Sequence, residues 1–141
     1  LDTRLNQHYQ NTKKVINFLK KQKKVKEILY PYNPSSKNYK LWKKYYSGAT
    51  GLLSIVIKSK KKSSVIKFVN SLELFGIGYS WGGFESLAIL QDLRSSKKGE
   101  YIQGRKYYRF YKDEHIVRLH IGLEDPKDLI NDLKSSLKYV K

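Results

Sequence analysis

The chain has 141 residues, 40% of them hydrophobic, which is enough for one domain with a buried core. No apolar run approaches the roughly 18 residues of a membrane span, and residues 1–10 lack the apolar core of a signal peptide, so the sequence predicts a cytoplasmic protein without a membrane segment. There is no cysteine, which excludes disulfides, a thiolate nucleophile and a thiolate metal site.

The formal net charge of +17 is typical of proteins that bind nucleic acid. The distribution of this charge argues against specific recognition, because lysines far outnumber arginines and are spread over every segment. Specific readers of nucleic acid use arginine forks gathered in one patch. From charge alone we expect weak, salt-sensitive binding to polyanions and no specific nucleic-acid partner.

Helices and strands alternate along the first half of the chain. Leu5, Tyr9 and Ile16 fall at helical spacing and predict an amphipathic helix over residues 3–22. The next expected elements are a strand over 25–30, a loop over 31–36, a short helix over 39–46 and a strand over 52–57.

In the second half, Ser63 and Ser64 are candidate caps of a helix. The apolar positions of this helix are Val65, Ile66, Val69 and Leu72. A strand is expected over 74–80, no element is assigned over 87–100 apart from a loop at 95–99, and 101–111 is expected to form an irregular strand or hairpin.

The chain ends with a strand over 116–121 and a helix. Asp125 is the expected N-cap of that helix, Pro126 its first residue and Asp128 its third. Its buried stripe is Leu129, Ile130, Leu133 and Leu137. The element order predicts an α/β fold of two layers, with a small sheet and helices packed on one face.

Two stretches are candidates for function. Tyr79, Ser80 and Trp81 precede a Gly-Gly pair, where an expected strand opens into a tight turn. Arg118 lies in the late strand, on the face opposite Val117, Leu119 and Ile121. An arginine in an apolar strand needs an anionic partner, which is either one of the twelve acidic residues or a ligand.

These two stretches, residues 79–83 and 116–126, closely resemble the C-terminal part of the Cys/Met-metabolism family of pyridoxal-phosphate enzymes. The likeness is greatest to the bacterial cystathionine β-lyases in that family. It extends to the opening helix, the 31–36 loop and residues 47–51, and so covers nearly the whole chain.

The resemblance implies that residues 1–141 are the small C-terminal domain of such an enzyme, with residues 1–22 as a leading helix that joins it. The chain begins at Leu1 and has no methionine, so we expect a fragment. The Schiff-base lysine and the site for pyridoxal 5'-phosphate would lie upstream in a larger domain. No catalytic or cofactor-binding residue is expected here, and three scattered histidines predict no metal site.

The resemblance also implies roles for four residues. Arg118 would bind the α-carboxylate of the amino-acid substrate, which suits a guanidinium fork. Ser80 would lie beside the same carboxylate, and Trp81 and Tyr79 would wall the pocket. Family members that act at the γ-carbon often carry Glu in place of Tyr79, so this position favours a β-lyase.

The expected activity of the full-length enzyme is cleavage of cystathionine to homocysteine, pyruvate and ammonia in methionine biosynthesis (transsulfuration), by a cytoplasmic homotetramer. The 141-residue chain alone would be inactive. Two alternatives remain. One is a γ-acting relative, either a cystathionine γ-synthase or a γ-lyase. The other is a non-catalytic basic module that binds polyanions.

Overall fold

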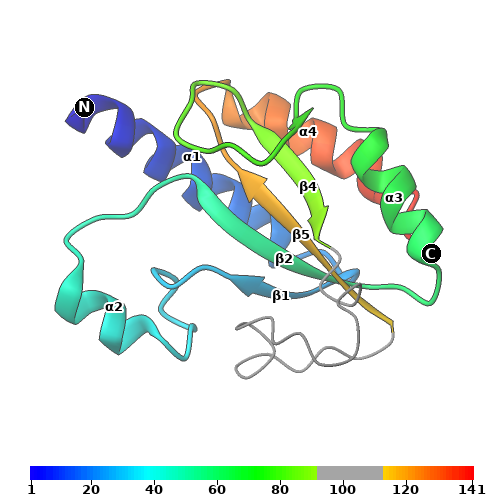
Figure 1. Ribbon diagram of the computed structural model, residues 1–141, viewed down its shortest axis with the longest axis horizontal. Helices are drawn as coiled ribbons and strands as arrows, with labels where there is room; N and C mark the ends of the chain where they lie inside the picture. The colour runs from blue at the N-terminus through cyan, green and yellow to red at the C-terminus, as the bar shows by residue number, and fades with distance from the viewer. Residues whose placement is uncertain (92–112) are drawn as a thin grey trace.

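A computed structural model describes residues 1–91 and 113–141 of the chain. Five strands form one sheet in the order β1-β2-β5-β4-β3 (Figure 1). The strands are β1 (Val25–Leu29), β2 (Leu52–Lys58), β3 (Gly76–Ile77), β4 (Leu87–Gln91) and β5 (Glu114–His120). The helices are α1 (Asp2–Leu19), α2 (Tyr39–Tyr45), α3 (Lys62–Asn70) and α4 (Pro126–Leu137).

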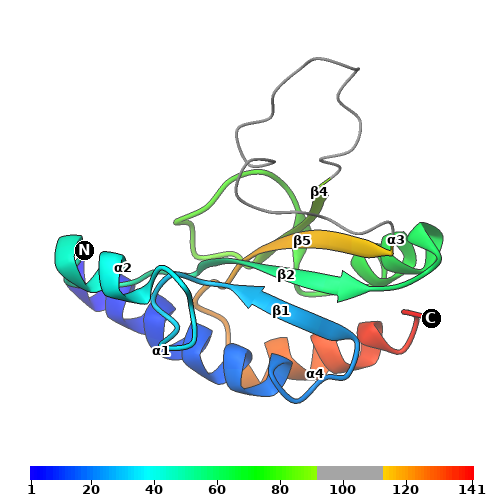
Figure 2. The ribbon, with the colours of Figure 1, turned by 90° about the horizontal axis from the view of Figure 1, so that it is seen from below.

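The sheet is covered by helices on one face, as the element order predicts. Figure 2 shows α1 and α4 along the lower face of the sheet in that view, and α3 contributes side chains to the same core. The short helix α2 lies apart from these, beyond the end of β1. Among the described helices, none is both long enough and apolar enough to cross a membrane.

Strand β5 lies at the centre of the sheet and pairs antiparallel with both of its neighbours. Its residue Arg118 is opposite Ser54 of β2 on one side and Ile89 of β4 on the other. His120 is opposite Leu52 and Leu87. The polar residues of β5 therefore project from the middle of the sheet, where neighbouring strands hold the backbone on both sides.

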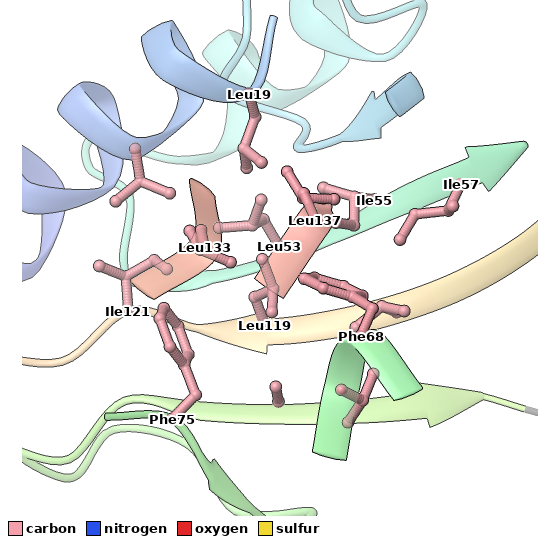
Figure 3. Close-up of a cluster of buried hydrophobic side chains, with 14 of the residues drawn as sticks. Leu19, Leu53, Ile55, Ile57, Phe68, Phe75, Leu119, Ile121, Leu133 and Leu137 are labelled. Carbon is pink, nitrogen blue, oxygen red and sulfur yellow. The ribbon is translucent and has the colours of Figure 1, made fainter. Parts of the chain in front are cut away.

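The core lies between the sheet and the helices, as Figure 3 shows. Alternate residues of β5 supply its centre, since Val117, Leu119 and Ile121 are fully buried. They pack with residues from β2 and the helices, among them Leu19, Leu53, Ile55, Phe68, Leu133 and Leu137. The expected division of this strand into a core face and an opposite face is confirmed.

The last helix begins as the sequence predicts. The side chain of Asp125 accepts a hydrogen bond from the backbone N–H of Lys127 at 2.8 Å, and Pro126 is the first helical residue. Leu129, Leu133 and Leu137 are buried, and Ile130 is half-buried.

Two details of α3 differ from the prediction. The helix begins at Lys62, and its N-cap Lys61 makes no side-chain cap, so Ser63 and Ser64 lie within the first turn. The Ser64 hydroxyl instead donates to the carbonyl of Lys61 at 2.8 Å. Ile66 is 41% exposed and Phe68 is buried, because positions 65, 68 and 69 share one helical face.

The strand predicted over residues 74–80 is wrong for most of its length. Only β3 forms, pairing in parallel with β4 through Gly76 and Ile77. Phe75 is the buried residue of this stretch, whereas Leu74 and Ile77 are exposed. A Cβ on Gly76 would lie 3.2 Å from Leu87 Cδ2, so the glycine permits close approach to β4.

The strand β4 is the element that the sequence did not assign. Its run Leu87-Ala88-Ile89-Leu90 is continuously apolar, so it carries no period that separates a strand from a helix. Its pairing with β5 makes this run a strand. The loop expected at 95–99 and the hairpin expected at 101–111 lie outside the described residues.

An aromatic cluster holds α2 beside the rest of the domain. Trp42 of α2 packs edge-on against Tyr32 with ring centroids 4.3 Å apart, and the hydroxyls of Tyr9 and Tyr32 share a hydrogen bond of 2.6 Å. This hydrogen bond is the main cause that raises the pKa of Tyr32. Burial raises the pKa of Tyr30, whose hydroxyl donates to the carbonyl of Thr50 at 2.8 Å.

Candidate functional site

Residues 78–86 form a loop between β3 and β4, hereafter the 78–86 loop. It rises on the face of the sheet opposite α1 and α4 (Figure 2). Gly82 has a φ of 81°, a backbone conformation that residues with a side chain rarely adopt, so the turn needs glycine there. Three of its large side chains are exposed: Tyr79 by 68%, Trp81 by 64% and Phe84 by 65%.

The C-terminal half of this loop is fixed to the end of β5 through its backbone. The N–H of Leu123 donates to the carbonyl of Phe84 at 2.8 Å. A Cβ on Gly122 would lie 2.2 Å from that same oxygen, so only glycine permits the approach. Glu124 completes the attachment by accepting from the Ser86 N–H at 2.6 Å and from its hydroxyl at 2.8 Å.

Arg118 meets the N-terminal half of the loop. Its guanidinium donates to the backbone carbonyl of Tyr79. The guanidinium carbon lies 5.6 Å from the centroid of the Tyr79 ring and 5.9 Å from that of Trp81, which is the range of cation–π contact. The structure thus brings together Arg118, Tyr79 and Trp81, across 39 residues of sequence.

Ser80 lies between the two aromatic residues. Its side chain is exposed, and its hydroxyl makes no hydrogen bond to any other residue that the structure describes. The backbone of this serine follows directly on the carbonyl that Arg118 holds. All four residues singled out from the sequence therefore lie within one turn and the strand beneath it.

The charge of Arg118 is not neutralised within the described parts of the chain. Its side chain has no carboxylate within ion-pair distance in residues 1–91 and 113–141, where the ion pairs are Lys26 with Glu114 and Lys58 with Asp113. One carbonyl uses only part of a guanidinium that carries five N–H donors. The remaining donors, beside two exposed rings, can bind a carboxylate in a bidentate fork.

A cavity of about 470 Å³ lies beside this turn and involves residues that sequence reasoning did not use. His8 of α1 and His120 of β5 line it, with ring centroids 5.1 Å apart, together with Arg4, Trp81 and Gly82. The sequence feature that could have indicated His120 is its position two residues after Arg118, which places both side chains on the same face of the strand. His8 gave no signal, because only the folded chain brings α1 to the end of β5.

The described residues do not supply a cofactor site of the kind that the resemblance implies for the whole enzyme. A Schiff base needs a sequestered lysine amine, and no lysine that the structure describes is buried. Within the same residues, no three His, Cys, Asp or Glu side chains gather as metal ligands.

Comparisons with known proteins show which family this chain is similar to. The sequence model of the family described as Cys/Met metabolism PLP-dependent enzyme matches residues 1–138. A cystathionine beta-lyase of Bordetella avium is 37% identical over 97% of the chain and 33% of its own length. An L-alanine/L-glutamate racemase of Wolbachia pipientis wMel is 36% identical over 97% of the chain and 32% of its own length.

A cystathionine gamma-lyase of Macaca fascicularis is 34% identical over 98% of the chain and 33% of its own length. The chain therefore spans about a third of the length of the curated relatives it matches. Among solved structures, a putative O-acetylhomoserine (thiol)-lyase of Campylobacter jejuni, which contains a pyridoxyl-lysine phosphate group, superposes with a TM-score of 0.73. It is 31% identical, over 96% of this chain and 28% of that one.

The sheet with helices on one face, the 78–86 loop above it and the family match over 138 residues lead to one assignment. This chain belongs to the Cys/Met metabolism family of enzymes that depend on pyridoxal phosphate.

Proposed function

We propose that this chain is the substrate-carboxylate-binding part of a pyridoxal-phosphate-dependent carbon–sulfur lyase that acts on cystathionine. The observation that carries the proposal is the state of Arg118. Its guanidinium is aligned by the Tyr79 carbonyl and flanked by two exposed rings, and no carboxylate in the described residues pairs with it.

In this proposal Arg118 binds the α-carboxylate of the amino acid through two parallel N–H bonds. The Tyr79 carbonyl holds one N–H of the guanidinium and leaves the other donors for the carboxylate. The Ser80 hydroxyl is positioned to donate to the same carboxylate. Tyr79 and Trp81 keep water from one side of the pair, which strengthens it relative to an exposed ion pair.

The cofactor of the family supplies the electron sink for loss of the α-proton. We assign its lysine and its phosphate site, through family resemblance, to a part of the protein outside these 141 residues, which span about a third of the curated relatives' length. Methionine biosynthesis, a cytoplasmic location and a homotetramer belong to the proposal through family resemblance alone.

The choice of cystathionine and of β-elimination rests on the aromatic pair. Identity alone does not separate the activities, because the β-lyase, racemase and γ-lyase relatives are 37%, 36% and 34% identical. Tyr79, where γ-acting members often carry Glu, favours the β-lyase. The racemase is a second candidate, because its similarity equals that of the β-lyases over the whole chain.

The test is the Arg118→Ala variant of the full-length protein, assayed with cystathionine. Truncation of one partner of a buried charge pair costs about 2–5 kcal/mol, so we expect kcat/KM to fall by roughly 30-fold to several thousand-fold. Arg118→Lys should recover only part of this loss, because lysine lacks the fork. Lys134→Ala, which removes an exposed cation on α4, is the matched control.

Unchanged kcat/KM in Arg118→Ala would contradict the assigned role. Product analysis separates the candidates: pyruvate with homocysteine for the β-lyase, 2-oxobutyrate with cysteine for a γ-lyase, and D-alanine from L-alanine for a racemase. Absence of all three, with tight sequence-selective binding of nucleic acid at physiological salt, would favour the polyanion-binding module.

A further inference from the structure

His120 is the second residue of β5 that reaches the 78–86 loop. It lies two positions after Arg118, so both side chains leave the strand on the same face. Arg118 donates to the carbonyl of Tyr79, and His120 Nε2 donates to the carbonyl of Gly83 at 3.1 Å. Two residues of one strand therefore bind the turn, one before Trp81 and one after it.

We propose that His120 is a positioning residue of the carboxylate site: by holding the Gly83 carbonyl as a neutral imidazole, it sets the turn so that Tyr79 and Trp81 lie over Arg118. The effect on substrate rests on the function proposed above, whereas the effect on the turn does not.

The turn depends on such contacts because its side chains do little to hold it. Tyr79, Trp81 and Phe84 are all about two-thirds exposed. Arg4 of α1 also donates to the turn, at the Gly82 carbonyl, but this 3.2 Å contact is exposed to solvent. His120 is 3% exposed and its hydrogen bond to Gly83 is half-buried, so this contact is less open to competing water than that of Arg4.

The surroundings of the ring favour its neutral state. With Nε2–H donating to Gly83, Nδ1 carries a lone pair, and this buried atom has no partner among the described residues. Gly51 lies against that edge, since a Cβ there would be 3.1 Å from both Cε1 and Nδ1. A proton added at Nδ1 would be buried without an acceptor, which is costly.

The charged and titratable groups around the ring act in both directions. His8 and Arg4 approach from α1, Glu124 follows β5, and Arg118 is on the same strand. Burial is the largest cause and lowers the pKa of His120; the Gly83 carbonyl opposes it, His8 lowers the pKa further, and Glu124 has the smallest, raising effect. His8 is itself held by a hydrogen bond of 2.7 Å between Nδ1 and the Ile121 carbonyl.

The first experiment uses the 141-residue chain and ¹H–¹⁵N spectra. The chain has two tryptophans, so the indole N–H of Trp81 reports on the turn, and that of Trp42, in the aromatic cluster, is an internal reference. We expect the Trp81 signal to move between pH 7.5 and pH 5 with a midpoint below His120's ordinary value of 6.5, while the Trp42 signal stays.

Two variants test whether His120 causes this pH response. His120→Gln keeps an N–H donor that does not titrate, so the Trp81 signal should stay at its pH 7.5 position throughout. His120→Leu removes the donor and should displace that signal at every pH. A pH response that persists in His120→Gln would show that another group causes it and would overturn the proposal. An undisplaced signal in folded His120→Leu would also overturn it. If His120→Leu does not fold, the comparison of the parent with His120→Gln decides.

The second experiment measures kinetics of the full-length lyase. We expect His120→Leu to raise KM by about 3- to 30-fold with kcat changed less than about threefold, and His120→Gln to stay within about twofold of the parent. A fall in kcat at constant KM would contradict a positioning role. If Arg118→Ala leaves activity unchanged while the Trp81 signal still responds to pH through His120, the proposed function fails. The proposal that His120 positions the turn then stands.

Discussion

The two faces of β5 differ in what their side chains contact. On one face, Val117, Leu119 and Ile121 are completely buried against helices and neighbouring strands. On the other, Arg118 and His120 donate hydrogen bonds to backbone carbonyls of the 78–86 loop. Apolar contacts are non-directional and scale with buried area. The polar contacts each need one atom in one place.

This difference predicts that the stability of the fold and the position of the turn can be changed separately on a single strand. Substitutions on the apolar face should change the free energy of unfolding and leave the turn intact in whatever fraction remains folded. Substitutions on the polar face should move the turn at a smaller cost in stability. Each prediction below tests one side of that division.

Leu119→Ala should have the largest effect. The side chain is fully buried at the centre of the core, and loss of a buried leucine costs about 2–5 kcal/mol through lost transfer energy and the cavity left behind. Urea unfolding of the 141-residue chain, followed by far-UV circular dichroism, measures it. A loss below about 1 kcal/mol would show that this face is not where stability resides.

Gly122→Ala should follow, because it acts where the two faces meet. The new Cβ would lie 2.2 Å from the Phe84 carbonyl oxygen, so the loop or the end of β5 must shift, at about 1–3 kcal/mol. Gly48→Ala is the matched control. No atom lies within 4 Å of its Cβ position, and it should be neutral or stabilise by about 0.4–1 kcal/mol. Equal effects in the two variants would contradict the close approach of loop and strand.

The pH dependence of stability tests the polar face. His120 has a folded-state pKa below its unfolded value of 6.5, so between these values the unfolded chain binds more protons. Its contribution to stability is therefore fully present above about pH 6.5 and is lost as pH falls through the folded-state pKa. Urea unfolding between pH 7.5 and pH 5 should show this loss, and His120→Gln should reduce it. An identical pH profile in that variant would rule out His120 as the source.

Trp81→Ala should have the smallest effect on stability. The ring is 64% exposed and packs on no part of the core, so we expect a change within about 0.5 kcal/mol. Thermal unfolding of the variant and of the parent chain under the same conditions measures this change in stability. A loss comparable to that of Leu119→Ala would mean that the turn is part of the folding core, and the division between the faces would fail.

Sequence reasoning succeeded where one period dominated a segment. The helical spacing of Leu129, Leu133 and Leu137 and the alternation around Leu119 predicted buried faces that the structure confirms. It failed where the run was uniformly apolar or rich in glycine. The continuous run of β4 carried no period, and the stretch from Leu74 to Ser80 looked like a strand although only Gly76 and Ile77 find a partner.

The same contrast holds for the site. The sequence by itself determined that Arg118 leaves β5 on the face away from the core, because side chains of a strand alternate whatever surrounds them. The tertiary structure decided that the guanidinium meets the Tyr79 carbonyl, that His120 meets Gly83 and that His8 lies beside it. Those partners are set by strand register and by the docking of Phe84 against Gly122, which are long-range contacts that local spacing does not encode.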